Sequence, residues 1–170
     1  MSDQTGHDPL DGIEKYRAVK ELGRGGMGEV YLAEHVHLGT KVVIKLLHLE
    51  LSEKATLVDR MRREAQALAR LAHPNLVRVT DFDRTPKGRP YFVMEYLPGR
   101  SLRDEVNLRG GFLPVVEALA VVGQACAGLG FAHDNGLVHR AIKLDTLFVC
   151  AGAAPRATTV LQIPAWVLTA

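Results

Sequence analysis

A single lysine interrupts an apolar, β-branched run that otherwise predicts a buried strand. Residues 41–47 read Lys-Val-Val-Ile-Lys-Leu-Leu, and Lys45 lies inside the run. An unpaired ammonium group is costly to bury, so the fold has to bring an anion to this strand. Glu64, on the helix predicted next, can supply that anion. The alternative is that Lys45 extends its amine to solvent while Glu64 pairs with Arg60 one helical turn earlier.

A glycine-rich run precedes this strand. Residues 23–30 read Gly-Arg-Gly-Gly-Met-Gly-Glu-Val, a G-x-G-x-x-G-x-V spacing that joins one predicted strand to the next. Glycines at these positions let backbone N–H groups approach phosphate oxygens that a β-carbon would keep away. A glycine-rich hairpin turn has the same pattern and is commoner, so the run alone is weak evidence. Its spacing to Lys45 favours a phosphate site.

Short apolar runs and one helical pattern organise the first hundred residues. Apolar residues recur at helical spacing over 56–71 and predict an amphipathic helix. Apolar, β-branched runs bounded by turn residues predict five strands. These strands are expected at 16–22, 29–34, 41–47, 76–82 and 91–95.

A Leu-Pro-Gly sequence at 97–99 breaks this pattern and marks the end of a first lobe. Ser101 is placed to cap a short helix. Pro114 opens a longer helix, over 114–132, that is apolar on nearly every side and therefore expects burial all round. Its polar, glycine and proline residues make it a poor membrane span, so we expect a helix of a globular lobe and no membrane.

Five segments in fixed order resemble the protein kinase family in its bacterial Ser/Thr form. They read LGRGGMGEVYLAEH, VVIKLL, RREAQALARLAHPNLVRV, FVMEYLPGRSL and GLVHRAIK. The resemblance implies an α+β, protein kinase-like fold: a small N-lobe with a five-stranded antiparallel sheet and one helix, then a partial helical C-lobe. We expect a flexible lead at 1–13, the N-lobe at 14–96, the partial C-lobe at 97–150 and an aberrant apolar tail at 151–170.

The resemblance also implies a site for ATP. Met94 matches the residue at the back of the adenine pocket, and Glu95 and Leu97 match those whose backbone binds the base. Val43 and Phe148 replace smaller residues usual in the family, so we expect ATP to bind weakly. The residues implied in nucleotide binding are Leu22, Gly23, Gly25, Gly28, Val30, Val43, Lys45, Glu64, Met94, Glu95, Leu97 and Phe148.

The catalytic loop of the family, H-R-D-x-K-P-x-N, is degenerate in this chain. Ala141 replaces the aspartate that accepts the proton of the substrate hydroxyl, a role worth roughly 10²- to 10⁴-fold in rate. Thr146 replaces the asparagine that binds a metal ion. Asp145 is a tempting substitute base, but we expect its variable position to face solvent. The positions matched to the loop are His139, Arg140, Ala141, Lys143 and Thr146.

The Asp-Phe-Gly metal motif of the family is missing downstream. From 146 to 170 the only charged residue is Arg156, so no carboxylate is available there for magnesium. We therefore expect no metal site and ATP binding without Mg²⁺. Residues 157–163 are expected to pair with the strand that contains Phe148. The abrupt change in composition after Cys150 favours a truncated or frame-disrupted kinase sequence.

Composition argues against several other classes of protein. The chain has 21 Lys and Arg against 19 Asp and Glu, and a formal charge of +2 is too small to indicate nucleic acid or an anionic membrane as partner. Cys126 and Cys150 lack metal-ligand spacing and favour a reduced chain. The polar first twelve residues do not resemble a secretory signal, so we expect a cytoplasmic protein.

The leading interpretation is a Ser/Thr protein kinase-family domain that keeps some ATP binding and cannot transfer phosphate, a pseudokinase. One alternative is an active ATP-dependent kinase, if the natural product is longer. Another is a non-catalytic interaction module. The resemblance implies later helices that would cover the helix at 114–132, so without them we expect an exposed apolar patch, with self-association or a protein partner.

Overall fold

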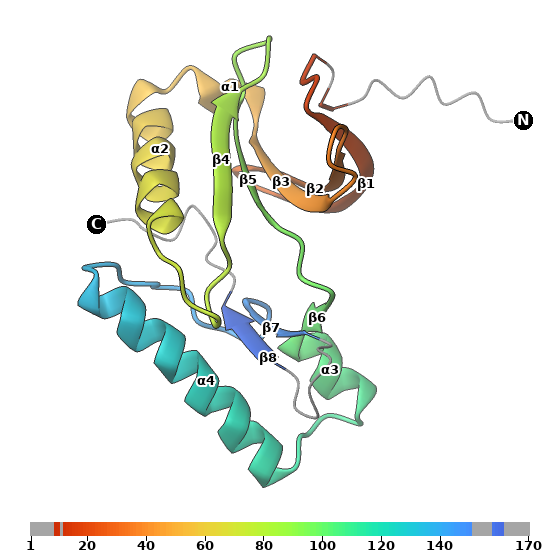
Figure 1. The fold of residues 1–170 in the computed structure, drawn as a ribbon, viewed down its shortest axis with the longest axis vertical. Coiled ribbons are helices and arrows are strands. Elements are labelled where there is room, and N and C mark those ends of the chain that lie inside the picture. The colour runs from red at the N-terminus through yellow and green to blue at the C-terminus, as the bar shows by residue number, and fades with distance from the viewer. Residues whose placement is uncertain (1–8, 11, 151–157, 162–170) are drawn as a thin grey trace, which may run out of the picture. The chain divides into compact units, whose positions relative to one another are not determined.

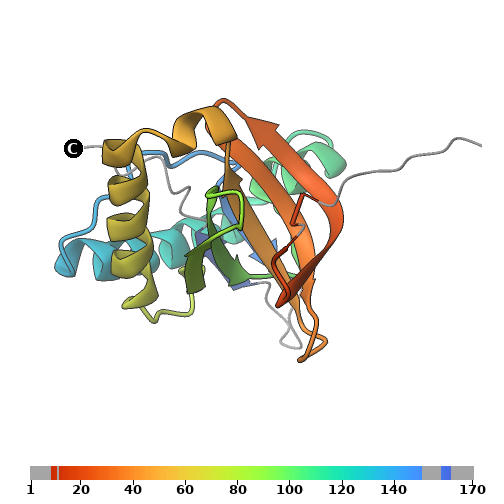
Figure 2. The same ribbon diagram turned by 90° about the horizontal axis from the view of Figure 1, so that it is seen from above.

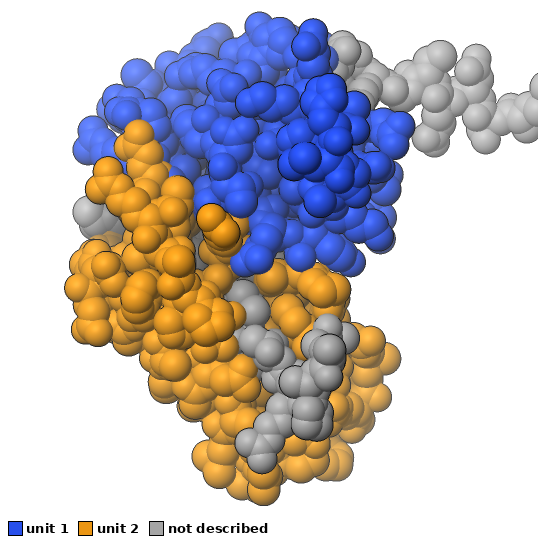
Figure 3. All heavy atoms as spheres, viewed as in Figure 1, with its two compact units in different colours: residues 1–65, 79–96 blue, residues 66–78, 97–170 orange. Residues whose placement is uncertain are grey.

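A computed structural model describes residues 9, 10, 12–150 and 158–161 of the chain (Figure 1). The chain divides into two compact units, which Figure 3 draws in different colours. Unit 1 contains Met1–Ala65 and Val79–Tyr96, and unit 2 contains Gln66–Arg78 and Leu97–Ala170. The units divide after Tyr96, at the predicted end of the N-lobe. Residues 66–78, however, group with unit 2, although the predicted N-lobe range 14–96 includes them.

Unit 1 is built on a five-stranded antiparallel sheet in the order β1-β2-β3-β5-β4, which confirms the predicted sheet. The sheet is twisted, as Figure 2 shows from above. The fourth strand starts later than the predicted 76–82, because the buried Leu76 and Val77 lie in an irregular segment before it. The strands are β1 (Tyr16–Gly25), β2 (Gly28–His35), β3 (Lys41–Leu47), β4 (Val79–Arg84) and β5 (Pro90–Glu95).

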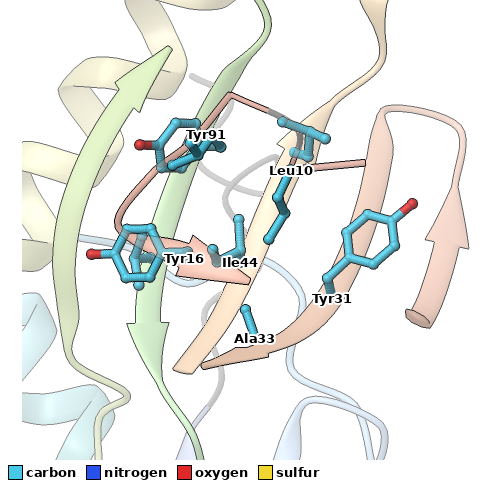
Figure 4. Packing of buried hydrophobic residues seen from close by; sticks show 9 residues of the cluster. Leu10, Tyr16, Tyr31, Ala33, Ile44 and Tyr91 are labelled. Atoms are coloured by element: carbon cyan, nitrogen blue, oxygen red, sulfur yellow. The ribbon is translucent and has the colours of Figure 1, made fainter. Parts of the chain in front are cut away.

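One face of this sheet carries a hydrophobic core cluster of unit 1 (Figure 4). Successive side chains of a strand point to opposite faces, so alternate residues of β2, β3 and β5 enter this core. The β-branched and aromatic residues at these positions explain why the runs form strands. The core residues are Leu10, Ile13, Tyr16, Tyr31, Ala33, Ile44, Leu46, Tyr91 and Val93.

The predicted flexible lead at 1–13 is wrong at its C-terminal end. Leu10 and Ile13 are buried in the core, with Leu10 only 1% exposed. Gly12 permits the turn between them, since its φ of +83° is one that side chains rarely adopt and a Cβ there would lie 2.5 Å from Cγ of Pro86. Two apolar residues in a polar stretch thus fill a gap over the sheet. Residues 1–8 and 11 lie outside the described part of the chain.

Two helices follow β3. The short α1 (Leu49–Ser52) was not predicted, whereas α2 (Ala55–Ala69) is the helix predicted over 56–71. Buried residues of α2 recur three and four positions apart and form its apolar side, as the sequence pattern requires. They are Val58, Met61, Ala65 and Leu68.

Unit 2 combines two helices with a small three-stranded sheet in the order β6-β7-β8. The predicted cap is confirmed, because the N–H of Asp104 donates to Oγ of Ser101 at 3.1 Å. Close packing requires glycine at position 99, since a Cβ on Gly99 would lie 2.1 Å from the carbonyl oxygen of Val149. The elements are β6 (Gly99–Ser101), α3 (Leu102–Leu108), α4 (Val115–Asp134), β7 (Leu147–Cys150) and β8 (Thr158–Leu161).

Helix α4 is buried along one side only. Ala125, Gly128 and Ala132 are its buried residues. The amide of Gln124 accepts a hydrogen bond from Asn75 on the same side, at 3.3 Å. Within the given residues the opposite side is exposed and apolar, with Val115, Val116, Leu119 and Val122 each more than half exposed. By length and composition alone α4 could also cross a membrane, but one such helix is weak evidence of a membrane span.

Candidate functional site

The glycine-rich run lies largely within the β1–β2 hairpin. Gly25 faces Gly28 in the register, and only Gly26 and Met27 form the turn between them. The first strand therefore extends three residues beyond its predicted end at residue 22. The pairing of Gly23 with Val30 places both predicted nucleotide-binding residues side by side on neighbouring strands.

The glycines of the run have different reasons to be glycine. A Cβ on Gly28 would lie 2.3 Å from the carbonyl oxygen of Leu46, so close packing requires this glycine. A Cβ on Gly23 or Gly25 would meet no atom within 4 Å, and neither residue has a positive φ. Neither the backbone nor the packing of the described chain requires them. Glycines without a structural reason are typical of places where a ligand approaches the backbone.

Hydrogen bonds hold the tip of this hairpin. The N–H of His48 donates to the carbonyl oxygen of Met27 at 3.0 Å. Nε2 of the same histidine lies 2.7 Å from the carbonyl oxygen of Gly25. Arg24 forms ion pairs with Glu21 and Glu29. These contacts fix the backbone of the run in one position.

Glu29, which sequence reasoning missed, supports this hairpin from the core face of the sheet, the face that it shares with Tyr31 on β2. Its carboxylate is buried and accepts hydrogen bonds from Arg89 at 3.1 Å and from the hydroxyl of Tyr31 at 3.0 Å. Burial opposes ionisation, yet these hydrogen bonds and the charges of Arg89 and Arg24 hold the pKa of Glu29 below its ordinary value. Its only sequence signal is an acidic residue in an apolar strand, because its main partner lies 60 residues away.

The face of the sheet opposite the core collects most of the remaining predicted residues of unit 1. Lys45 faces Val30 on β2 and Phe92 on β5, and two positions earlier Val43 faces Met94. Cross-strand partners share a face, as do residues two apart on one strand. Val30, Val43, Lys45 and Met94 therefore line the same face.

Three other predicted residues lie around this group. Leu22 lies in the exposed part of β1, before Gly23. Glu95 ends β5 and faces Val42 in the register. Glu64 lies on α2, and its carboxylate acts electrostatically on Lys45. The structure thus assembles ten of the twelve predicted nucleotide-binding residues within unit 1.

Lys45 and Glu64 are both buried, with 5% and 6% of their surface exposed. Burial lowers the pKa of Lys45 to about 6, although the negative charge of Glu64 raises it. Burial also raises the pKa of Glu64 to about 7, against the hydrogen bond and charge of Arg60 and the charge of Lys45. The desolvated lysine is therefore a group whose charged form an incoming anion would stabilise.

Arg60 completes this group in the way that the alternative interpretation of the sequence proposed. Its Nε donates to Oε1 of Glu64 at 3.1 Å, one helical turn away. The other oxygen, Oε2, is buried without a hydrogen-bond partner in the described part of the chain, as is Nη2 of Arg60. Glu64 thus pairs directly with Arg60, as the alternative interpretation has it, while its charge also acts on Lys45. The other half of that alternative is wrong, because Lys45 is buried and does not extend to solvent.

The predicted catalytic loop lies in unit 2, and hydrogen bonds within the loop hold its backbone. His139 is 1% exposed, and its Nδ1 accepts the N–H of Ala141 at 3.3 Å. The hydroxyl of Thr146 accepts the N–H of Lys143 at 3.1 Å and lies 2.9 Å from the carbonyl oxygen of Ala141. Thr146 is buried, so its hydroxyl serves the loop and is not presented to a metal ion.

Asp145 is engaged by a neighbouring helix. Nε and Nη2 of Arg103 lie 2.6 and 3.1 Å from its two carboxylate oxygens, a bidentate pair. The hydrogen bond from Arg103 lowers the pKa of Asp145, which weakens it as a proton acceptor. Lys143 and Arg140 are exposed, and Arg140 has a φ of +58°, in the left-handed region.

Two predicted nucleotide-binding residues belong to unit 2. Leu97 is buried, and Phe148 is half-buried in β7, where it faces Ser101 and Val160 in the register. The expected hairpin partner at 157–163 is β8, Thr158–Leu161. Within the residues that the structure describes, no group of three His, Cys, Asp or Glu side chains is arranged to hold a metal ion.

Comparison of the sequence with known families and proteins gives a consistent result. Residues 16–155 match the family model "Protein kinase domain". The chain is 43% identical over 144 residues to serine/threonine-protein kinase Pkn1 of Myxococcus xanthus, covering 84% of this chain and 20% of Pkn1. It is 40% identical over 141 residues to serine/threonine-protein kinase PknB of Mycobacterium tuberculosis, covering 81% and 22%. The chain therefore spans about a fifth of the length of these relatives.

Comparison of the structure with solved structures agrees with the result of the sequence comparison. The kinase domain of PknI from Mycobacterium tuberculosis superimposes with a TM-score of 0.74 at 28% identity. The match covers 92% of this chain and 61% of that domain. Both the predicted protein kinase-like fold and the predicted bacterial Ser/Thr form are confirmed.

Proposed function

This chain belongs to the protein kinase domain family of the bacterial Ser/Thr type, and we propose that it binds an adenine nucleotide and does not transfer phosphate. Binding rests on the residues of unit 1, where the glycine run, Lys45 and the apolar face of the sheet carry the proposal. Leu97 and Phe148 are added by family resemblance alone.

The observation that carries the proposal is the open backbone at Gly23 and Gly25. Neither glycine is required by φ or by packing, whereas a phosphate that approaches the backbone N–H groups would require both. Lys45 adds the complementary charge on the adjacent strand, since it faces Val30, the residue paired with Gly23. A phosphate group would add a further negative charge beside Lys45, next to that of Glu64.

Apolar residues on the same face suit a flat base. Val30, Val43 and Met94 line it, and Val43 and Met94 are buried. Val43 is larger than the alanine usual in the family, and extra methylenes in a packed slot cost about 1–3 kcal/mol. We therefore expect weak binding.

The groups needed for phosphate transfer do not fit. Position 141 carries a methyl group, the hydroxyl of Thr146 is used by the loop backbone, and Asp145 is held by Arg103. The residues described thus offer neither a base at the expected place nor a carboxylate cluster for Mg²⁺. A magnesium ion would add little to nucleotide affinity.

Isothermal titration calorimetry with ATP tests the proposal. We expect binding that Lys45→Met weakens at least about tenfold, whereas Lys41→Met, an exposed lysine on the same strand, leaves it unchanged. Titrations in buffers of different ionisation enthalpy are expected to show proton uptake near neutral pH, because phosphate raises the pKa of Lys45. Absence of binding, or a tightening of about tenfold (1.4 kcal/mol) by Mg²⁺, would contradict the proposal.

A further inference from the structure

We propose that His48 is a positioning residue that holds the glycine run in the conformation that binds phosphate, an inference that rests on the proposed nucleotide binding. His48 follows β3 directly, the strand that contains Lys45. It contacts two carbonyl groups at the tip of the β1–β2 hairpin. Its backbone N–H donates to the oxygen of Met27 at 3.0 Å, and Nε2 of its ring lies 2.7 Å from the oxygen of Gly25.

The ring contact fixes the direction of a peptide group in the run. A carbonyl oxygen only accepts, so at this distance Nε2 of His48 is the donor. The peptide bond between Gly25 and Gly26 is planar and trans, so the carbonyl of Gly25 and the N–H of Gly26 point in opposite directions. Because His48 binds the carbonyl, the N–H of Gly26 points away from the ring.

The side of the hairpin on which the ring lies decides where this N–H points. Nδ1 of His48 lies 3.8 Å from Oε1 of Glu29, whose carboxylate is on the core face of the sheet. The ring therefore lies on the core side of the hairpin. The N–H of Gly26 consequently points away from the core side, and Lys45 lies on the opposite face, where the phosphate is proposed to bind.

A network of hydrogen bonds keeps this arrangement in place. The other oxygen of Glu29, Oε2, accepts hydrogen bonds from Arg89 at 3.1 Å and from Tyr31 at 3.0 Å. Nε of Arg89 also donates to the carbonyl oxygen of Leu47 at 2.9 Å, the residue before His48. Arg89 thus holds both the carboxylate beside the ring and the backbone from which the ring extends.

Helix capping does not explain the histidine at this position. His48 is the N-cap residue of α1, a place that favours Ser, Thr, Asp and Asn. Within the described part of the chain, its side chain makes no capping hydrogen bond to α1. The ring contacts Gly25 instead, so the side chain serves the glycine run.

A run held in advance favours binding. Glycine has the most backbone freedom to lose, and each residue that orders only on binding weakens affinity. His48 fixes the peptide groups that follow Gly25 and Met27 before any ligand arrives. Loss of this hold should therefore loosen the run and weaken nucleotide binding together.

Two substitutions of similar shape separate the donor from the rest of the side chain. His48→Gln keeps an N–H donor for Gly25, because the amide nitrogen of glutamine is as many bonds from Cα as Nε2 of histidine. His48→Asn places its amide one bond nearer the backbone, at the level of Nδ1, and loses the contact. Asparagine is also a favoured N-cap residue, so a weakened α1 would not explain its effect.

Backbone ¹⁵N relaxation of the nucleotide-free chain tests the hold on the run. In the wild type we expect order parameters near about 0.85 at Gly25 and Gly26, and in His48→Asn a fall toward about 0.6. His48→Gln should restore the wild-type values. His37→Asn, at an exposed histidine in another turn, should not change them. A run that is already mobile in the wild type, or one unchanged in His48→Asn, would overturn the proposal.

Calorimetry with ATP tests the consequence for phosphate binding. His48→Asn should weaken affinity at least about fivefold, and His48→Gln should stay within about twofold of the wild type. Equal losses in both variants would overturn the role of the donor. Absence of ATP binding by the wild type would contradict the proposed function and with it the phosphate role of His48, while relaxation still decides whether His48 holds the run.

Discussion

The carbonyl oxygen of Leu46 lies 2.3 Å from the position that a Cβ of Gly28 would occupy. Gly28 is therefore fixed by the packing of β2 against β3. Gly25, its partner in the register, has open space in the same direction. Packing thus explains one glycine of the motif, and a ligand would explain the other. One substitution at each position separates these two reasons.

Gly28→Ala should destabilise the fold, and Gly25→Ala should not. The alanine at 28 would force backbone apart at a cost of about 1–3 kcal/mol, whereas at 25 we expect a change within about 0.5 kcal/mol. Nucleotide affinity should fall in Gly25→Ala, because its Cβ holds the phosphate away from the backbone. Urea unfolding and calorimetry on both variants check this. Equal stability losses would contradict the packing argument, and unchanged affinity in Gly25→Ala would contradict the ligand argument.

Leu10 should contribute to stability despite its place in a polar N-terminal stretch. It is 1% exposed, so Leu10→Ala should lower the free energy of unfolding by about 2–5 kcal/mol. Leu38→Ala makes the same chemical change at a residue that is 68% exposed, and should cost less than about 0.5 kcal/mol. The comparison is made by chemical denaturation. Similar small losses in both variants would place Leu10 outside the core in solution.

Lys45 should give stability a distinct pH dependence. Burial lowers its pKa from 10.5 to about 6 in the folded chain, so between these values the unfolded chain binds more protons. Its contribution is fully present above pH 10.5 and is lost as the pH falls through about 6. The free energy of unfolding of the wild type, measured relative to Lys45→Met, should therefore rise with pH in this window. Lys41→Met, at an exposed position, should run parallel to the wild type.

The sheet was predictable because its strands carry their own signals. Successive residues of β2 and β3 alternate between the core face and the face of Lys45, and the sequence shows this two-residue period. The pairing of Gly23 and Gly25 within β1 was not readable, since glycine has low strand propensity and only cross-strand hydrogen bonds extend the strand.

Long-range contacts explain what the sequence did not reveal. Burial of Leu10 depends on a gap over the sheet, and the ionised Glu29 depends on Arg89 from a distant hairpin. The site residues Lys45 and Glu64 were found from local patterns. The structure was needed to show that Glu64 also pairs with Arg60, because the local pattern allowed either Lys45 or Arg60 as its partner.

Asp145 should not act as a substitute base. Because Arg103 holds it in a bidentate pair, Asp145→Asn should leave nucleotide affinity and phosphate transfer at the level of the unmodified chain. Calorimetry and a phosphate-transfer assay, with Asp134→Asn as an exposed acidic control, check this. Loss of any measured transfer in the Asp145 variant alone would give that carboxylate a catalytic role.

Incorporation of labelled phosphate from ATP tests the central claim most directly. The chain is assayed on itself and on generic Ser/Thr substrates, beside Lys45→Met and an active kinase domain that shows the assay works. We predict incorporation no higher than in Lys45→Met, and no rescue by Ala141→Asp, because residues 146–170 also contain no carboxylate to bind a metal ion. Incorporation clearly above the Lys45→Met control would contradict the account of a nucleotide-binding domain without phosphate transfer.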